Sequence, residues 1–426
     1  MGNKLPEGWT SCPLKDVVSS RKGKKPATVI DQEKKGYDPY LLIDELEGKP
    51  ARAFTNDPKV PRAAKEDVLL VWDGSIGKCA SGISGAVGST IVVLSPKNEL
   101  NTKFLEYFIR RSKNYILETS TGTGLQHINK NFLKTLEIPL PPEKQQKRIA
   151  HKLDALLAKV KDAQSRLDKI PTILGRFRQS VLAAAFSSEL TKEWRKKNKC
   201  SEVTKLLKRN EYKIANEIEL PDLPDSWMWG ALGNYADCSR GRFSIRPRND
   251  PRYYNGKYPF IQIGDLPREG GYINKHSQTL NDLGLSISKM FPKGTVTIAI
   301  VGATIANTGI LGYDMCFPDS MVGIETGDEI RNRYCELFLR YKKHDIRQEA
   351  YSSGGQPNIK LQTLNPLPIA IAPAEEQVEV VKRVEHQLQI IDEFLEEYQH
   401  IKGYTDKLEQ SILAKAFRGE LVMQAK

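Results

Sequence analysis

At 426 residues the chain is longer than one ordinary hydrophobic core supports, so we expect two or more domains. Hydrophobic residues make up 39% and charged residues 27%, which excludes a disordered or fibrous protein. The net charge of +12 suits a polyanionic partner, because lysines and arginines that neutralise phosphates release condensed counterions.

The N-terminus and the cysteines indicate the compartment. No stretch approaches about 18 uncharged apolar residues, and residues 1–10 have no apolar segment that could act as a signal peptide, so we expect a cytoplasmic protein. The six cysteines form no CxxC pair, which argues against a zinc site and a disulfide framework. We therefore interpret them as reduced structural thiols and expect no metal site.

Residues 1–142 are predicted to form the first of two mixed α/β domains. The β-branched run at 68–74, closed by glycine, is typical of a buried strand, and 101–117 is predicted to be helical. A basic cluster at 21–25 and a polar glycine loop at 121–130 suit contacts to phosphates and base edges, with a solvated loop and simple turns as the alternatives. The candidate DNA-binding residues are Arg21, Lys22, Lys24, Lys25, Gln126, His127, Asn129 and Lys130.

Residues 143–222 are predicted to form a central helical spacer followed by a basic linker. From Glu143 the apolar residues step alternately by four and three positions, which is the spacing of a coiled-coil seam. The seam residues are Ile149, Leu153, Leu156, Val160, Leu167 and Ile170. The run 192–213 is interpreted as a solvated connector because of its many charges.

Residues 223–372 are predicted to form the second domain, with a buried strand at 296–302. Arginines interleaved with tyrosines suit phosphates, guanine edges and thymine methyl groups, and the glycine loop at 352–360 matches the loop of the first domain. The candidate DNA-binding residues are Arg240, Arg242, Arg246, Arg248, Arg252, Lys257, Tyr253, Tyr254, Gln356, Asn358 and Lys360.

Residues 373–426 are predicted to form a distal helical spacer whose seam is Val380, Val384, Ile391, Phe394, Tyr398 and Ile401. Residues 143–170 hold eight basic and four acidic residues, whereas 374–401 hold two basic and eight acidic residues. Because opposite charges favour association, we expect these two helices to pair antiparallel with each other. We also expect the pair to set the distance between the two domains. The alternative is that each helix packs on its own domain.

The chain is internally duplicated. Residues 179–190 (QSVLAAAFSSEL) and 410–421 (QSILAKAFRGEL) share eight of twelve positions at an offset of 231, and LPEGW at 5–9 matches LPDSW at 223–227. The predicted fold is therefore α+β, with two globular mixed α/β domains separated by two long helices that form an antiparallel coiled coil, related by a pseudo-twofold internal repeat.

Motifs of catalysis are missing from the sequence. It contains no GxGxxG, no Walker lysine loop, no HExxH and no GxSxG. The nearest match, residues 37–40 (YDPY), lacks the second proline of the D/N-P-P-Y/F loop of adenine methyltransferases. The six histidines have no partners at recognisable catalytic spacing, so we nominate no catalytic residue.

Residues 141–160 (PPEKQQKRIAHKLDALLAKV), 170–195 (IPTILGRFRQSVLAAAFSSELTKEWR) and 410–421 resemble the helical regions of type I restriction-modification specificity subunits. The resemblance implies two target-recognition domains that alternate with two helical spacers. In the first unit the glutamate of the family's PPxxEQ pattern is replaced by Gln145. Any partner contact that this glutamate makes in the family would be missing there.

The resemblance further implies a non-catalytic, sequence-specific DNA-binding subunit that reads a bipartite asymmetric target. It implies double-stranded DNA, two methyltransferase subunits and two motor-nuclease subunits as partners. These partners would methylate adenine N6 with S-adenosylmethionine and restrict unmodified DNA with ATP and Mg²⁺, so no cofactor is expected in this chain. Two alternatives are kept, a stand-alone DNA methyltransferase or nuclease and a non-specific coiled-coil adaptor.

Overall fold

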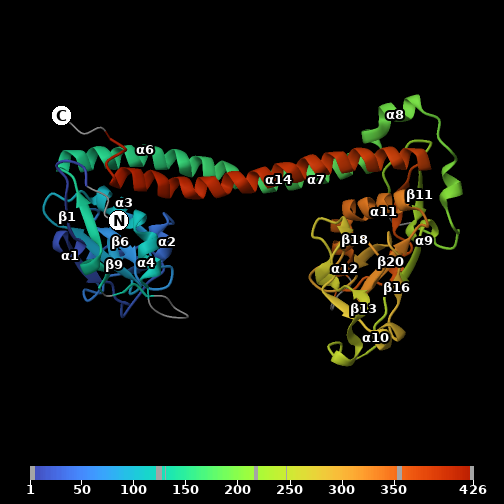
Figure 1. Ribbon diagram of the computed structural model, residues 1–426, viewed down its shortest axis with the longest axis horizontal. Helices are drawn as coiled ribbons and strands as arrows, with labels where there is room; N and C mark the ends of the chain where they lie inside the picture. The colour runs from blue at the N-terminus through green and yellow to red at the C-terminus, as the bar shows by residue number, and fades with distance from the viewer. Residues whose placement is uncertain are drawn as a thin grey trace. The chain divides into compact units, whose positions relative to one another are not determined.

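The computed structural model describes residues 5–120, 127–129, 131–214, 219–245, 247–352 and 357–422. The chain forms two units, each with its own core (Figure 1). Unit 1 comprises Met1–Lys169 and Tyr398–Lys426, and unit 2 comprises Ile170–Glu397. Each unit therefore combines one predicted recognition domain with segments from both predicted spacers.

The described part of unit 1 contains two four-stranded sheets and one strand pair. The first sheet has the order β2-β9-β6-β7 with antiparallel neighbours, the second has the order β4-β3-β8-β5, and β1 pairs with β10. The predicted strand at 68–74 corresponds to β6, whose four residues are all buried. The strands are β1 (Thr10–Pro13), β2 (Val18–Lys22), β3 (Asp38–Leu41), β4 (Phe54–Thr55), β5 (Arg62–Ala63), β6 (Val68–Val71), β7 (Cys79–Ser81), β8 (Gly85–Val87), β9 (Ile91–Pro96) and β10 (Glu137–Leu140).

In unit 1, α3 packs between the first sheet and α6 (Figure 1). Asn101 caps α3 by accepting a hydrogen bond from the backbone N–H of Phe104. The apolar face of α3 carries Phe104 and Phe108, which are fully buried. The helices are α1 (Leu14–Val17), α2 (Ile43–Leu46), α3 (Thr102–Arg111), α4 (Lys113–Glu118), α5 (Phe132–Thr135), α6 (Glu143–Leu167) and the last part of α14 (Ala374–Phe417).

The described part of unit 2 contains a five-stranded sheet of order β12-β20-β17-β18-β14, a four-stranded sheet of order β15-β13-β19-β16, and the pair β11-β21. The predicted strand at 296–302 corresponds to β17. The strands are β11 (Met228–Ala231), β12 (Asp237–Arg240), β13 (Tyr254–Phe260), β14 (Tyr272–Ile273), β15 (Gln278–Leu280), β16 (Met290–Phe291), β17 (Val296–Ala299), β18 (Thr308–Leu311), β19 (Met315–Cys316), β20 (Met321–Glu325) and β21 (Pro368–Ile371).

In unit 2, α11 packs between the five-stranded sheet and α7 (Figure 1). The helices are α7 (Ile170–Phe186), α8 (Lys192–Lys197), α9 (Leu232–Tyr235), α10 (Asp282–Ser286), α11 (Glu329–Tyr341), α12 (Lys343–Ser352), α13 (Leu361–Leu364) and the first part of α14; 3-10 turns are η1 (Glu189–Thr191), η2 (Val203–Leu206), η3 (Pro251–Tyr253) and η4 (Ile263–Asp265). Within the described ranges, no helix combines the length and apolarity that a membrane span requires.

The duplication extends into the interiors of the units. The sheet order β2-β9-β6-β7 is repeated as β12-β20-β17-β18. Residues 103–110 (KFLEYFIR) on α3 correspond to 333–340 (RYCELFLR) on α11 at an offset of 230. In both, a buried glutamate accepts a hydrogen bond from a strand hydroxyl: Glu106 from Ser81 at 2.6 Å, and Glu336 from Thr308 at 2.9 Å. The interiors therefore share one architecture.

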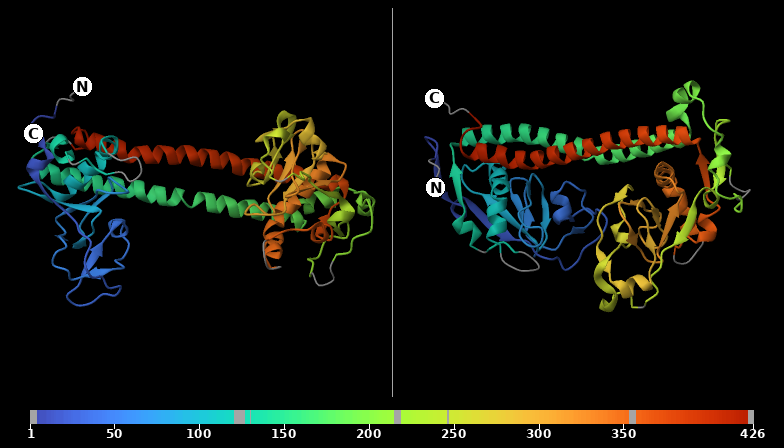
Figure 2. Two further views of the ribbon diagram at one scale, coloured as in Figure 1. Left: turned by 90° about the horizontal axis from the view of Figure 1, so that it is seen from below. Right: turned by 45° about the vertical axis from the view of Figure 1, so that its right-hand side comes forward.

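An antiparallel helix pair completes each unit. In unit 1, Lys402 of α14 lies 2.9 Å from Asp168 after the end of α6, while Phe417 joins the cluster around Ile149 near the start of α6. In unit 2, the Arg383 guanidinium donates to the Leu190 carbonyl oxygen at 2.8 Å, and Arg178 forms an ion pair with Asp392. Figure 2 shows α14 running alongside α6 and α7 in both views.

The antiparallel pairing of the central and distal helices is confirmed, but the two predicted seams do not face each other along their length. The 149–160 stripe of α6 packs with the 413–417 end of α14, and the 380–391 stripe of α14 packs with the 181–186 end of α7. The reason lies in the duplicated QS(V/I)LAxAF segments. Their alanines Ala185 and Ala416 are fully buried and belong to the same hydrophobic clusters as the two stripes.

Individual seam residues also differ from the prediction. Phe394 is 60% exposed and Ile401 is 39% exposed, so neither belongs to the core. The seam residues that are buried are Ile149, Leu153, Val160, Val380, Val384 and Ile391, whereas Leu156, Leu167, Ile170 and Tyr398 are half-buried. Leu157 and Leu388, which the prediction omitted, are buried as well. Each stripe faces its own domain as well as a helix, and a domain surface does not follow the narrow 3.5-residue period.

Phe417→Ala should lower the unfolding free energy of unit 1 by about 3–5 kcal/mol, because it empties a site packed against Phe104 and Phe108. Phe394→Ala, on the same helix but exposed, is the matched control and should change stability by no more than about 0.5 kcal/mol. Denaturant unfolding, with hydrogen exchange in β1–β10 to report on unit 1, measures both. Equal losses would contradict this core assignment.

Candidate nucleic-acid interface

In unit 1 the structure brings together two segments that the sequence nominated separately. The Lys22 ammonium at the end of β2 donates to Asp73 at 2.8 Å, and Nδ1 of His127 lies 2.6 Å from the other carboxylate oxygen of Asp73. Partial burial acts to raise the pKa of Asp73, but the hydrogen bonds from Lys22 and His127 outweigh it and hold the pKa below its usual value. Asp73 therefore stays ionised between the two candidates.

The other basic candidates of unit 1 are placed differently. The Arg21 guanidinium is turned to the protein, where it contacts Asp67 at 2.7 Å and the Arg62 carbonyl oxygen at 2.9 Å. Lys24 and Lys25 are exposed beyond the end of β2. Arg21 therefore stabilises the sheet through these contacts, whereas Lys24 and Lys25 face solvent.

The arginine cluster of unit 2 is tied to loops. Arg240 donates to the Asp319 carbonyl oxygen at 2.6 Å, Arg248 pairs with the Asp319 carboxylate, and Arg242 donates to the Ser288 carbonyl oxygen at 2.7 Å. All three arginines are exposed. Their backbones and guanidinium positions are therefore fixed while part of each side chain remains open to a ligand.

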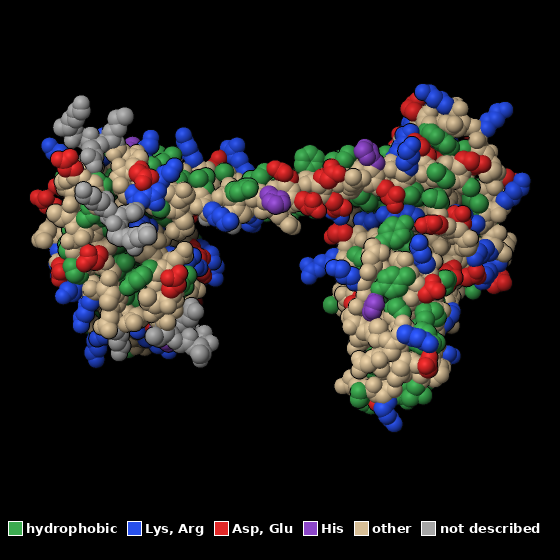
Figure 3. Space-filling view, in the orientation of Figure 1, with side chains coloured by type: hydrophobic (Ala, Val, Ile, Leu, Met, Phe, Trp, Pro, Cys, Tyr) green, Lys and Arg blue, Asp and Glu red, His purple; other side chains and the backbone are tan. Residues whose placement is uncertain are grey.

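Further along the same region, Arg252 pairs with Asp250 at 2.6 Å and Lys257 lies 3.7 Å from Asp282. Tyr253 and Tyr254 pack against the buried ring of Phe243. The two tyrosines therefore support the local core with part of their rings. In Figure 3, blue and red side chains are intermixed over the visible face of each unit.

The two glycine loops are anchored at equivalent places. The Ile128 N–H donates to the Trp72 carbonyl oxygen at 3.1 Å, and the Ile359 N–H donates to the Ile300 carbonyl oxygen at 2.9 Å. Asn129 is half-buried, whereas Asn358 and Lys360 are exposed. Four candidates, Gln126, Lys130, Arg246 and Gln356, lie outside the described residues.

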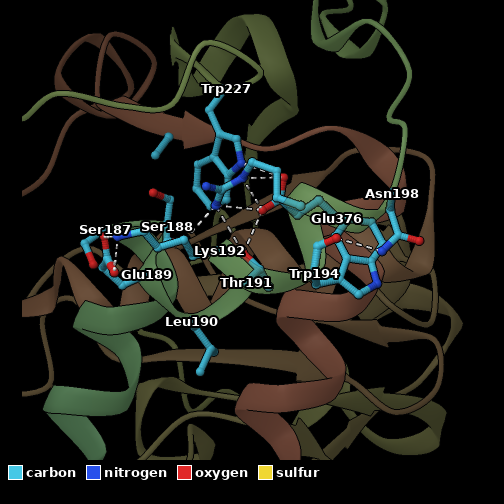
Figure 4. Close-up of polar contacts among 12 residues, drawn as sticks. Ser187, Ser188, Glu189, Leu190, Thr191, Lys192, Trp194, Asn198, Trp227 and Glu376 are labelled. Carbon is cyan, nitrogen blue, oxygen red and sulfur yellow. Dashed lines mark hydrogen bonds and ion pairs between the residues drawn. The ribbon is translucent and has the colours of Figure 1, made fainter.

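A fully buried carboxylate binds the segment that follows α7 to the rest of unit 2. Glu376, at the start of α14, accepts hydrogen bonds from the Thr191 hydroxyl at 2.7 Å, from Nε of Arg195 at 2.9 Å and from Nε1 of Trp227 at 2.8 Å. Figure 4 shows Trp227 and Thr191 converging on Glu376. The interpretation of 192–213 as a solvated connector is therefore wrong for Arg195, whose side chain is 17% exposed.

The described part of unit 1 lacks this charged centre. Gln145 takes the place of Glu376, and Trp9 takes the place of Trp227. Within the described part of the chain, Nε1 of Trp9 and Nε2 of Gln145 are buried without a hydrogen-bond partner. The Glu376 carboxylate is fully buried, and its hydrogen bonds are all made with donors of this chain.

Sequence reasoning missed Asp73, Arg195 and Glu376. The LPEGW and LPDSW repeat could have drawn attention to the tryptophan that meets Glu376, since a buried indole N–H needs an acceptor. In the described ranges, no group of three or more His, Cys, Asp or Glu residues is placed to hold a metal ion.

The sequence is similar to a known protein family and to characterised members of it. A family model described as "Type I restriction modification DNA specificity domain" matches residues 6–171 and 224–398. The chain is 29% identical over 423 residues to the EcoDI specificity subunit of Escherichia coli, covering 99% of this chain and 90% of that protein. It is 30% identical over 429 residues to the EcoBI specificity subunit of Escherichia coli, covering 98% and 87%.

Two solved structures share the fold at 20% sequence identity. One, from work on complex assembly and conformational transition of the type I R-M system, has a TM-score of 0.74 and covers 98% of this chain and 99% of that chain. The other, the HsdS subunit from Thermoanaerobacter tengcongensis, has a TM-score of 0.57 and covers 98% of both chains.

Glu376→Ala should destabilise unit 2 by roughly 3–5 kcal/mol, because it leaves the Arg195 charge and the Trp227 N–H without their acceptor. Glu375→Ala is the matched control: this neighbouring carboxylate is exposed and accepts hydrogen bonds from Ser201, so a loss below about 1 kcal/mol is expected. Hydrogen exchange in the β11–β21 pair reports on unit 2. Similar losses in both variants would show that Glu376 is not a central anchor.

Proposed function

The chain belongs to the family of type I restriction modification DNA specificity proteins and is a type I restriction enzyme specificity subunit, and we propose that each unit reads one half of a bipartite, asymmetric DNA target. The observation that carries the proposal is the repeated sheet with unlike side chains at its ends. β2 ends in Lys22 opposite Val92, and β12 ends in Arg240 opposite Val322. Two copies of one frame with different polar groups suit two different half-sites.

Electrostatics supports binding to double-stranded DNA. The net charge of +12 favours phosphate contacts, which supply most of the sequence-independent affinity. In the proposal, exposed basic residues such as Lys24, Lys25 and Lys360 bind phosphates, while side chains fixed by hydrogen bonds read base edges.

We further propose that the long helices bind the methyltransferase subunits. On unit 2, Ile173 and Phe177 lie four positions apart on α7 and are 58% and 47% exposed. On the unit 1 part of α14, Ile401, Tyr404 and Leu408 lie three and four positions apart and are 39%, 70% and 45% exposed. Exposed apolar side chains that share a helix face are typical of protein interaction sites.

The chemistry is assigned to partner subunits. In the proposal two methyltransferase subunits use S-adenosylmethionine to methylate adenine N6, and two motor-nuclease subunits use ATP and Mg²⁺ to restrict unmodified DNA. This chain supplies recognition and assembly and holds no cofactor. Its relatives' names, as specificity subunits of type I restriction enzymes, support this division of roles.

Replacing residues 5–142 by the corresponding domain of another family member should change one half-site and leave the other intact. The physical reason is that the sheets and loops of the two units have separate cores. Methylome sequencing of cells carrying the complete system measures the outcome, and the reciprocal replacement of 223–372 is the control. Simultaneous change of both half-sites would rule out independent reading.

Insertion of four residues after Lys169 and four after Ile401 should lengthen the spacer between half-sites by one or two base pairs. The two points lie level, since Lys402 contacts Asp168, and four helical residues add about 6 Å. Methylation mapping measures spacer and bases together. A single insertion, which leaves the helices unequal, serves as the control. An unchanged spacer in the double insertion would show that the helices do not set it.

A further inference from the structure

Lys22, Asp73 and His127 form a hydrogen-bonded cluster on unit 1. Lys22 is at the end of β2, and Asp73 is in the turn after β6. His127 lies in the glycine loop and forms a backbone bridge with Asp73. The side chains of Lys22 and His127 are 54% and 52% exposed, whereas that of Asp73 is only 20% exposed. The cluster thus presents two polar groups to solvent and keeps the carboxylate behind them.

The contacts determine what the two outer groups can offer. A carboxylate accepts hydrogen bonds, so Asp73 places the ring hydrogen of His127 on Nδ1. With one ring hydrogen on Nδ1, Nε2 offers an acceptor, and the Lys22 ammonium has two further hydrogens to donate. Asp73 fixes the position of a lysine head group that is otherwise mobile.

The corresponding positions of unit 2 hold different side chains. Arg240 matches Lys22, and the bridge between Val301 and Asn358 matches the bridge between Asp73 and His127. The supporting backbone is the same, because the residue after each bridge donates to the strand end, from Ile128 and from Ile359. A common backbone with three exchanged side chains is what readers of different bases require.

We propose that Lys22 and His127 are specificity-determining residues that read the major-groove edges of one or two adjacent base pairs, and that Asp73 is the positioning residue that orients them. Lys22 fits the O6 and N7 acceptors of guanine, and Nε2 of His127 fits the amino group of adenine or cytosine. The inference rests on the proposed function and names the reading element of the first unit.

The test uses the full chain assembled with its methyltransferase partners on a library with randomised half-sites. Lys22→Ala, His127→Ala and Asp73→Asn should each reduce discrimination roughly 5- to 150-fold at one or two adjacent positions of one half-site, and leave the other half-site unchanged. Asp44→Asn is the matched control, because Asp44 forms an exposed 2.9 Å pair with Lys49 in the same unit. It should leave the consensus intact.

A double-variant measurement separates positioning from folding. Asp73→Asn should have no further effect on discrimination in a chain that already carries Lys22→Ala and His127→Ala, and thermal unfolding should be unchanged. Uniform weakening on all sequences with a shallower salt dependence would make these residues phosphate contacts and overturn the proposal. An unaltered consensus would overturn it as well. Failure of the proposed function is distinct, since the wild-type complex would then methylate no bipartite target.

Discussion

Both units depend on a phenylalanine near the end of a long helix that inserts between aromatic side chains of the recognition domain. Phe417 lies 4.9 Å from Phe104 and 5.5 Å from Phe108 between ring centroids. Phe186 lies 5.3 Å from Tyr334 and 5.1 Å from Phe338. These contacts join the helix pair to α3 or α11, which in turn covers the sheet. Within each unit, the helices are therefore part of the core that supports the reading loops.

The two copies differ where a charge is buried. In unit 2 the Glu376 carboxylate accepts hydrogen bonds from three side chains, and one of these, the Arg195 guanidinium, is positively charged. In unit 1 the neutral amide of Gln145 stands at that place. A buried carboxylate requires a cation beside it, whereas an amide does not. Unit 2, with glutamate at this position, is therefore stabilised here by an ion pair, whereas unit 1, with glutamine, is not.

Duplication was the part of the fold that sequence could predict well. Eight shared positions in 179–190 and 410–421 indicated two related units, and glycine-closed β-branched runs indicated β6 and β17. The segments that meet within the helix pair could not be predicted in the same way. A heptad stripe shows that a face is buried but not which surface covers it, and net charge did not indicate the register of the two helices.

The site shows the same division between local and non-local information. Basic residues and glycine loops could be nominated because each is visible within a short stretch of the sequence. Asp73 could not, because its partners lie 51 and 54 residues away and only the fold brings them together. The match of 103–110 with 333–340 was also missed, since most of its positions conserve only the character of the side chain.

The division of the chain between the units has a consequence for synthesis. Unit 2 is one continuous segment, Ile170–Glu397, so all of its parts have been made before the last helix turns are translated. Unit 1 is split, and its core includes Leu413 and Phe417. Domains normally fold from the N-terminus as they emerge from the ribosome. The core of the first unit can therefore be completed only after residue 417 has been translated, later than every residue of unit 2.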